Sequence, residues 1–562
     1  MTSRSRGGRA AAAAAIAIAL ALLLALGLAG CGSSSTSTGG SSAAATTGTP
    51  KSGGTFTLSY LTEPSTLDPA IAYNVIDWNV EHDIFQSFFR YQPKPSDAGT
   101  VLIPALATEV PSVANGGISA DGRTITIHLR PGVKFQPPVN RLVTAQDFKY
   151  SFERMMASPL SPGTGFYTNV VGAQAFLDKK AKTISGFKVV DPATVQITLN
   201  QPDLSFLNAM TMEFTDVLAK EWVAKWGKQV NRHPLGTGPF MFDHWTPGQE
   251  IVLKKNPNYW EAGKPYLDQI TYKLSYNPST ALLKLQSGQV DALGDGVPPA
   301  DLVKVMASPQ WKPYVFQQQL IAISYVLMNV HMKPFDNLKV REAVSWAINR
   351  DKVVKLLGGQ AAALWQLYPP GLPGYEPGKK YYGYDPAKAK ALLAEAGYPN
   401  GFSTTYYTDN VDPDPKIAQS IQADLQAIGI NAAVKTVSND TLYALQGEPG
   451  KLPIGSFGWW MDFPDPVDWF VPLFSKSAAV PGGMNASFWW SPTSEKLFAE
   501  AQAITDPAAR LAKFDELQAY ILSQAPYASV YAPKQTTMCS TTTGGFYLHP
   551  VYQLDPANYW QK

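Results

Sequence analysis

The sequence of 562 residues predicts a mixed α/β protein of two or three domains. Alternating apolar and polar residues, which are typical of strands, dominate the first half of the chain. Amphipathic helices with clear start and stop signals alternate with strands in the second half. The length that remains after an N-terminal leader is too great for a single hydrophobic core.

The leader is indicated by a basic start followed by an apolar stretch. Arg4, Arg6 and Arg9 precede residues 10–30, which contain only Ala, Ile, Leu and Gly. The stretch ends in Leu-Ala-Gly directly before Cys31, which resembles the bacterial lipobox, where the cysteine is lipidated and becomes the first mature residue. We therefore predict a lipoprotein signal peptide at residues 1–30 and lipid on Cys31.

Two alternatives to a lipoprotein stay open. The leader fits an ordinary signal peptide, or a helical anchor with an incidental cysteine, because its apolar run could just span a bilayer. The lipoprotein is favoured by residues 32–49, which are Ser, Thr, Gly and Ala and cannot bury a core. We expect a flexible tether at residues 31–52 and a protein held at the cell membrane on its extracytoplasmic side, in the periplasm or at the cell surface.

Composition and the absence of certain motifs argue against a nucleic-acid-binding protein, a disulfide-stabilised protein and an enzyme. The 46 Lys and Arg residues stand against 44 Asp and Glu, so no nucleic-acid surface is expected. Cys539 has no disulfide partner if Cys31 is lipidated. No two of the six histidines lie within five residues, and neither a Walker loop nor a G-x-S-x-G elbow occurs. We expect no enzyme activity and no cofactor, while a metal or chelate site built from distant residues stays open.

In chain order, strands are predicted first. Residues 55–58 begin an alternating run, residues 124–129 follow an Asp-Gly turn, and residues 194–199 pair with 189–190 in a hairpin pattern. Helices follow. Asp385 is a predicted N-cap before Pro386 and an apolar stripe that ends at Gly397, and residues 416–428 repeat this design before a strand at 430–437.

Six stretches of the mature chain match one known pattern in the same order: 67–69 (Leu-Asp-Pro), 106–147 (with Arg-Pro-Gly-Val-Lys-Phe), 236–260 (with Gly-Thr-Gly-Pro-Phe), 285–291, 334–343 (with Val-Arg-Glu-Ala) and 384–398 (with Tyr-Asp-Pro). With these stretches the chain resembles the large extracytoplasmic solute-binding proteins of ABC importers, the oligopeptide/dipeptide/nickel-binding group. The chain departs from that family after Phe135, where residues 136–140 replace a short polar turn, and we expect only a surface loop to differ there.

The resemblance implies a two-lobed, periplasmic-binding-protein-like fold (type II, large cluster) with mixed sheets, an inserted small domain and a hinge cleft. It also implies a monomer that captures peptides and delivers them to the transmembrane subunits of an ABC permease. The domains implied are lobe I at 53–88, 185–297 and 527–562, the inserted domain at 89–184 and lobe II at 298–526.

The strongest candidate site is the segment Gly-Trp-Trp-Met-Asp at residues 458–462. Trp459 and Trp460 would point to opposite faces of a strand, so only one could face a cleft, and Asp462 would share the face of Trp460. A carboxylate beside aromatic side chains suits a ligand that has a cationic group attached to an apolar portion. The resemblance implies that Asp462 holds the α-ammonium of a peptide; alternatively, the tryptophans are core and the aspartate caps a turn.

Weaker candidates come from the resemblance alone. Tyr73 lies where the first lobe would meet ligand, although it could be a packed surface tyrosine. Asn485 and Phe488 fall in a loop expected to line the cleft. The alternative functions are the same fold binding a non-peptide solute (a metal chelate, an oligosaccharide or an amino-acid derivative) and, from other classes, an enzyme or a sensory lipoprotein.

Overall fold

The computed structural model describes residues 48–562. The predictions for the signal peptide, for Cys31 and for most of the tether lie outside these residues. Within them, no helix is both long and apolar enough to cross a membrane.

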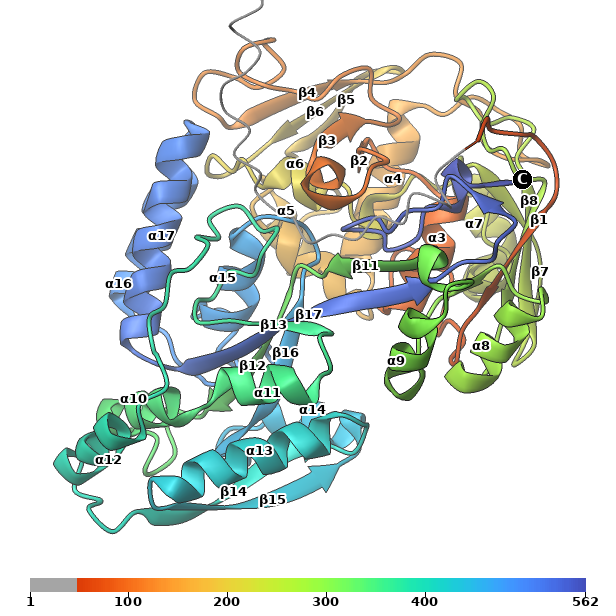
Figure 1. Cartoon of the computed structure of the whole chain (residues 1–562). Helices are drawn as coiled ribbons and strands as arrows, with labels where there is room; N and C mark the ends of the chain where they lie inside the picture. The colour runs from red at the N-terminus through yellow and green to blue at the C-terminus, as the bar shows by residue number, and fades with distance from the viewer. Residues whose placement is uncertain (1–47) are drawn as a thin grey trace, which may run out of the picture. The chain divides into compact units, whose positions relative to one another are not determined.

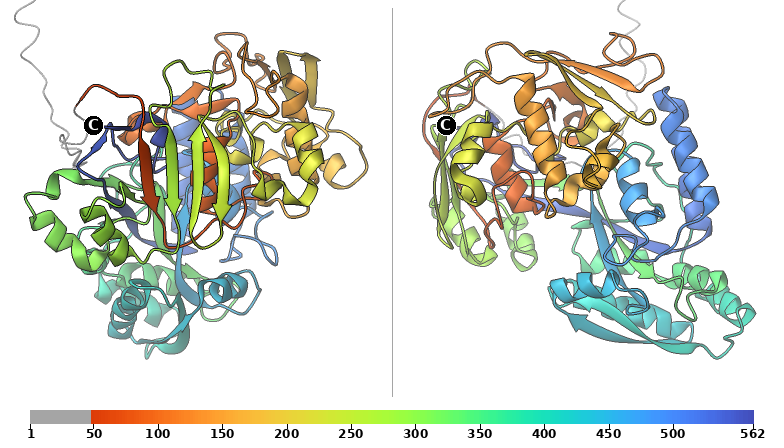
Figure 2. Two further views of the ribbon diagram at one scale, coloured as in Figure 1. Left: turned by 90° about the vertical axis from the view of Figure 1, so that its right-hand side faces the viewer. Right: turned by 180° about the vertical axis from the view of Figure 1, so that it is seen from behind.

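The first lobe is built on a five-stranded sheet in the order β10-β1-β9-β8-β7 (Figure 2, left). Strand β1 (Thr55–Ser59) runs parallel to both of its neighbours, whereas β8 is antiparallel to β9 and β7. Helix α3 (Val75–Ile84) packs on this sheet through a shared apolar core. The other strands are β10 (Ala292–Leu293), β9 (Gln269–Lys273), β8 (Glu250–Lys255) and β7 (Phe240–Thr246).

Two small sheets follow α3 in the chain. Strand β2 (Phe89–Tyr91) pairs with β3 (Leu102–Pro104), and β6 (Thr194–Thr198) lies between β4 (Thr124–His128) and β5 (Phe187–Asp191). The boundary expected at residue 184 therefore cuts through the second of these sheets. Because β5 and β6 complete the sheet begun by β4, they belong with the inserted region rather than with lobe I.

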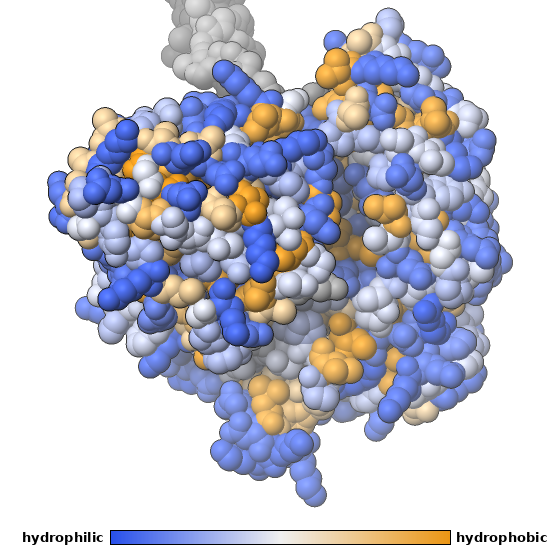
Figure 3. Space-filling model, turned by 90° about the horizontal axis from the view of Figure 1, so that it is seen from below, coloured by the Kyte–Doolittle hydropathy of each residue, from blue (hydrophilic) through white to orange (hydrophobic). Residues whose placement is uncertain are grey.

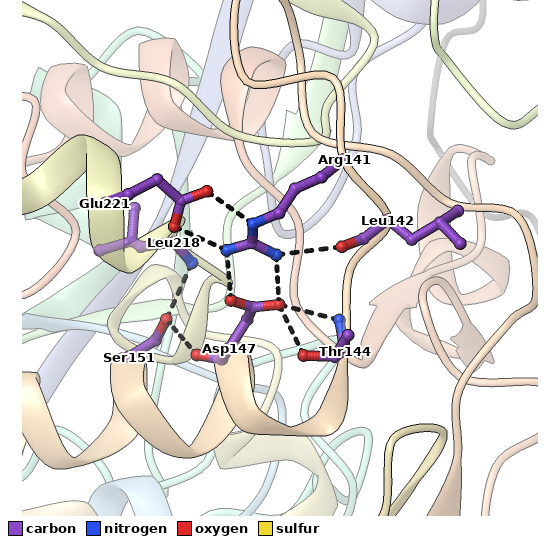
Figure 4. A network of polar contacts seen from close by, with 7 residues as sticks. All are labelled: Arg141, Leu142, Thr144, Asp147, Ser151, Leu218 and Glu221. Carbon is purple, nitrogen blue, oxygen red and sulfur yellow. Dashed lines mark hydrogen bonds and ion pairs between the residues drawn. The ribbon is translucent and has the colours of Figure 1, made fainter.

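Helix α4 (Ala145–Ala157) begins at a capping box that explains one of the family-like motifs (Figure 4). The Asp147 carboxylate accepts hydrogen bonds from the backbone N–H and the hydroxyl of Thr144, both at 2.9 Å. Arg141 binds the same carboxylate at 2.7 and 2.8 Å and also pairs with Glu221 of α7 (Lys220–Trp226). Arg141 thus links the start of α4 to α7, the helix through which the chain returns to lobe I.

The departure at residues 136–140 is not only a surface loop. Gln136 is buried, and its side-chain amide donates to the backbone oxygens of Ile84, Gly238 and Phe240. The prediction that only a surface loop differs here is therefore wrong for Gln136, because this buried side chain links the end of α3 to the start of β7.

The second lobe contains a seven-stranded mixed sheet in the order β11-β17-β12-β16-β14-β15, with β13 also paired to β17. Its apolar core packs against α10 (Leu338–Ala347), α12 (Pro386–Glu395) and α13 (Asp414–Ala427), which lie at the bottom of Figure 1. The strands are β11 (Val315–Gln319), β12 (Ala322–Met328), β13 (Ala361–Ala363), β14 (Phe402–Asp409), β15 (Ile430–Val437), β16 (Ile454–Trp460) and β17 (Tyr527–Met538).

Strand β17 passes between the two lobes beside β11, which also leads from the first-lobe core into the second lobe. Its first residues pair with β12, the residues from Lys534 to Met538 pair with β11, and Cys539 then bridges to Ala292 in the first-lobe sheet. The passage between lobes, expected at residue 527, therefore extends along the whole of this strand.

The remaining elements complete the two lobes. The pair α16–α17 stands at the left of Figure 1. These elements are α5 (Ala173–Leu177), α6 (Phe206–Ala209), α8 (Pro278–Gln286), α9 (Pro299–Ala307), α11 (Arg350–Leu356), α14 (Asn439–Gln446), α15 (Val467–Phe474), α16 (Pro492–Ala503), α17 (Pro507–Ser523), β18 (Thr543–Gly544) and β19 (Trp560–Gln561), with short 3₁₀ turns that include η2 (Pro162–Tyr167) and η3 (Glu213–Thr215).

Candidate ligand-binding cavity

A cavity of about 540 Å³ lies between the two lobes. Its size is within the range of small-molecule sites, about 300–1,000 Å³. The surface seen from below is hollowed between two blocks of the molecule (Figure 3). First-lobe residues on and before α3, residues of η3 and residues 550–553 form one wall. The opposite wall is formed by Leu320 and Ile321, by Tyr443 of α14, by residues 458–462 and by Met484.

An aromatic cluster forms the first-lobe wall. The ring of Tyr73 lies 5.5 Å from that of Trp78 and 5.6 Å from that of Phe214, and Trp78 meets Phe214 edge-on at 5.5 Å. Trp78 is further held by its Nε1, which donates to the Ala72 oxygen at 3.1 Å. Such packing holds the rings in place before a ligand arrives.

Both Trp459 and Trp460 have atoms at the cavity. Trp459 is buried and paired with Ile323 of β12, whereas Trp460 is 50% exposed. The two side chains differ in exposure as the alternation of faces in a strand predicts. Trp460 is the last residue of β16, and Asp462 lies beyond the strand.

Asp462 makes the one direct hydrogen bond across the cavity that the described residues show between its two walls. The Tyr73 hydroxyl donates to Asp462 Oδ2 at 2.7 Å, over a sequence separation of 389 residues. Burial raises the pKa of the Asp462 carboxyl to about 7, and the Tyr73 hydrogen bond offsets part of that rise. Near neutral pH this carboxyl is therefore poised between its charged and neutral forms.

Asp468 fixes the positions of Asp462 and Trp459 through hydrogen bonds. Its Oδ2 accepts the backbone N–H of Asp462 at 2.9 Å and Nε1 of Trp459 at 3.3 Å. Asp468 is fully buried, and burial followed by the charge of Asp462 raises the pKa of its carboxyl well above the usual value. Asp468 is thus a positioning residue: it holds Trp459 in the cavity wall and the backbone of Asp462, the candidate ligand anchor.

Four of the six candidate ligand residues meet at the cavity: Asp462, Trp459, Trp460 and Tyr73. Asn485 and Phe488 do not line it, contrary to expectation. Asn485 is fully buried, and its side chain donates to the backbone oxygens of Ser475 and Trp489, which fixes the loop from within. Phe488 is buried too, and their neighbour Met484 supplies the lining instead.

The sequence interpretation missed other lining residues, among them Trp78, Tyr443, Tyr552 and Glu213. Trp78 lies in α3, five residues after Tyr73, which itself precedes the helix. Glu213 lies in a 3₁₀ turn with no sequence pattern that indicates a site. In the part of the chain that the structure describes, no group of three or more His, Cys, Asp and Glu side chains could hold a metal ion.

A two-lobed α/β fold with an aromatic and acidic cavity between the lobes defines a protein that binds a small solute. The chain belongs to the bacterial extracellular solute-binding proteins, family 5, whose middle region matches residues 101–480. Members of this family are transport binding proteins and not enzymes.

Similar proteins support this assignment. The chain is 30% identical over 511 residues to the glutathione-binding protein GsiB of Shigella flexneri, covering 86% of this chain and 90% of that protein. A periplasmic binding protein associated with an ABC transporter, DppA of Helicobacter pylori in complex with the peptide STSA, is 28% identical with a TM-score of 0.77, over 91% and 98% of the two chains. A dipeptide-binding protein of Pseudoalteromonas sp. SM9913 with bound Met-Leu is 25% identical with a TM-score of 0.75, over 91% and 100%.

Proposed function

We propose that this protein is a lipid-anchored binding protein that captures short peptides in the inter-lobe cavity and delivers them to an ABC permease. The observation that carries the proposal is Asp462, a carboxylate at the edge of an aromatic cavity whose hydrogen-bond partner comes from the opposite lobe. A peptide's α-ammonium can replace the Tyr73 hydroxyl as the partner of this carboxylate. Trp459, Trp460 and Tyr73 then contact the body of the peptide.

The energetics favour an ammonium over a neutral group at this position. A hydrogen bond to a charged group contributes about 1.5–3 kcal/mol net, roughly twice that of a neutral pair. Contacts from both lobes exist together only in the closed form, so a ligand that makes them favours closure by its differential affinity. The closed form then presents both lobes to the permease in a fixed arrangement.

The lipid anchor is the part of the proposal that rests on the leader. Cys31 after a basic and apolar stretch, followed by a polar tether, is the pattern of a lipidated N-terminus. Metabolic labelling with a palmitate analogue tests it: we expect label on the wild-type chain and none on Cys31→Ser. Equal labelling of both would overturn the anchor without affecting the ligand.

The peptide ligand is tested by native mass spectrometry on the full chain, purified without refolding. We expect a series of bound masses that differ by amino-acid residue weights and disappear after denaturation and refolding. A single bound mass that is not a peptide would favour a dedicated binder of a non-peptide solute, and the proposal would then fail at the ligand while the family assignment stands.

A further inference from the structure

A second acidic group lines the cavity besides Asp462. Glu213, in η3, is only 7% exposed, yet its side chain lines the cavity. In the described part of the chain, its carboxylate has no ion pair and no hydrogen bond to another residue's side chain. Its own backbone N–H is the hydrogen-bond donor that it has. Ionising a buried carboxyl that has no ion pair is costly, so a ligand cation would supply what the protein does not.

More carboxylates lie behind Glu213. Glu81 of α3 is fully buried, and neither of its carboxylate oxygens has a hydrogen-bond partner among the described residues. Burial, followed by the charges of Glu213 and Asp216, raises the pKa of Glu81 well above its usual value. Burial also raises the pKa of Glu213 to about 8, with Asp462 as a further cause. Raised pKa values mean that these carboxyls hold their protons more readily, and a positive ligand group beside them would favour their ionised form.

Among residues 48–562, no Lys or Arg forms an ion pair with Glu81, Glu213 or Asp462. Arg90 is engaged by Glu261 at 2.7 Å, and Arg154 by Asp68 at 2.5 Å. His82, stacked on Tyr552 at the cavity wall, has its pKa lowered to about 4 by burial and is neutral near pH 7. Among the described residues, the cavity lining contains no Lys or Arg.

The lining therefore selects by charge. A positive group gains from Glu213, Asp462 and the faces of the surrounding aromatic rings, whereas a negative group finds no basic partner in the lining. Lys534 lines an adjoining cavity of about 660 Å³ that shares Asn74, Val75, Leu320 and Gln553 with this one. A peptide's terminal carboxylate can pair with Lys534 there, in a cavity that Glu63 and Asp295 also line.

We propose that Glu213 forms a second cation-binding subsite, so that the preferred ligand is a short peptide carrying a basic side chain in addition to its α-ammonium. The α-ammonium binds Asp462 from the second lobe, and the basic side chain binds Glu213 from the first. This inference rests on the proposed peptide function. It also separates this chain from a binder of acidic peptides, because the cavity has two acids where such a ligand needs bases.

The test compares matched tripeptides on the full-length chain by titration calorimetry. Each tripeptide carries Lys, norleucine or Glu at one of its three positions in an alanine background, so that Lys and norleucine differ mainly in charge. We expect wild type to bind the Lys peptide at least about tenfold more tightly than the norleucine peptide at one position, and the Glu peptide most weakly.

The variant Glu213→Gln removes the charge and keeps the shape. We expect it to bring the Lys-to-norleucine preference close to one while the norleucine peptide binds within about threefold of wild type, which also shows that the variant is folded. Glu109→Gln, an exposed glutamate far from the cavity lining, is the matched control and should keep the preference. An unchanged preference in Glu213→Gln, or no preference in wild type, overturns the subsite.

A second measurement needs no variant. Calorimetry at pH 7 in two buffers of different ionisation enthalpy should show that the Lys peptide releases more protons than the norleucine peptide, because the protonated Glu213 must ionise to pair with the basic group. Equal proton release contradicts the proposal. If no peptide binds wild type, titration with 1,5-diaminopentane distinguishes the cation subsite from the peptide function. Binding that is lost in Glu213→Gln would keep the subsite and reject the peptide function. No binding to wild type would reject both.

Discussion

At the scale of single residues, the site depends on Asp462 and its two neighbours. Tyr73 supplies a hydroxyl from the first lobe, and Asp468 holds the backbone from below. Burial places the pKa of Asp462 near 7, so this carboxyl must lose a proton in part of the molecules before it can bind an ammonium. We therefore expect ligand binding at this candidate anchor to be linked to pH.

We expect the affinity for trialanine to fall as the pH falls below about 7, by up to tenfold for each pH unit. The neutral carboxyl predominates in the empty protein at low pH and must ionise on binding. Trialanine has no basic side chain, so Glu213 does not contribute. Calorimetry from pH 5 to pH 7.5 measures the effect.

Asp462→Asn should bind trialanine about ten- to a hundredfold more weakly at pH 7 and lose the acidic dependence. Asp412→Asn, an exposed aspartate paired with Lys416, is the matched control and should behave as wild type. An acidic dependence that persists in Asp462→Asn would assign the titration to another group.

At the scale of elements, regular segments were predicted well. The strands at β1, β4 and β6, the helices α12 and α13 and the strand β15 are confirmed, and Asp385 caps α12 by accepting the Lys388 N–H at 2.9 Å. Capping residues and apolar periodicity are local, so one sequence contains them. The placement of β5 and β6 with β4 was missed because strand pairing depends on segments far apart in the chain.

The site itself was only partly predictable. The segment around Asp462 stands out by composition and does lie at the cavity. The sequence did not indicate that β16 ends at Trp460, which places Asp462 beyond the strand. Asn485 was expected in the cleft because it lies in a loop, but its amide satisfies backbone oxygens inside that loop. Glu213 gave no local signal, because an unpaired buried acid is recognised only when its surroundings are known.

The turn after β16 also depends on a distant helix. Asp465 pairs with Arg510 of α17 through two hydrogen bonds of 2.8 Å, and both side chains are buried. We expect Arg510→Met to destabilise the protein by about 3–5 kcal/mol, because Asp465 is left buried without its partner. Chemical denaturation followed by tryptophan fluorescence measures the loss.

Adding Asp465→Asn to Arg510→Met should recover much of this stability, because the unpaired charge is gone. If the double variant is no more stable than Arg510→Met alone, the loss comes from packing around the arginine stem rather than from the charge.

At the scale of the whole molecule, two of the contacts between the lobes lie beside the cavity. One is the Tyr73–Asp462 hydrogen bond, and the other brings Phe166 of η2 to 6.0 Å from Phe463 after β16. Both contacts involve residues next to the candidate ligand anchor. Closure and ligand binding thus act on the same few side chains.

Tyr73→Phe removes the hydroxyl and keeps the ring that packs on Trp78 and Phe214. We expect the ligand-free variant to have a larger radius of gyration by small-angle X-ray scattering than wild type, since one contact between the lobes is lost. With saturating peptide the two proteins should match. Tyr398→Phe, in the second lobe and outside the cavity lining, is the control, and an unchanged radius for Tyr73→Phe would show that this hydrogen bond does not govern opening.

The shared strand β17 has a mechanical consequence. Because its register is fixed by β12 at one end and by β11 at the other, the strand can twist but cannot slide. We therefore expect the lobes to reorient by a twist of this strand and of the neighbouring passage from β11 to β12, without translation along the strand. An insertion of one residue in β17 is expected to shift its pairing with β11 relative to its pairing with β12, and so to misalign the lobes.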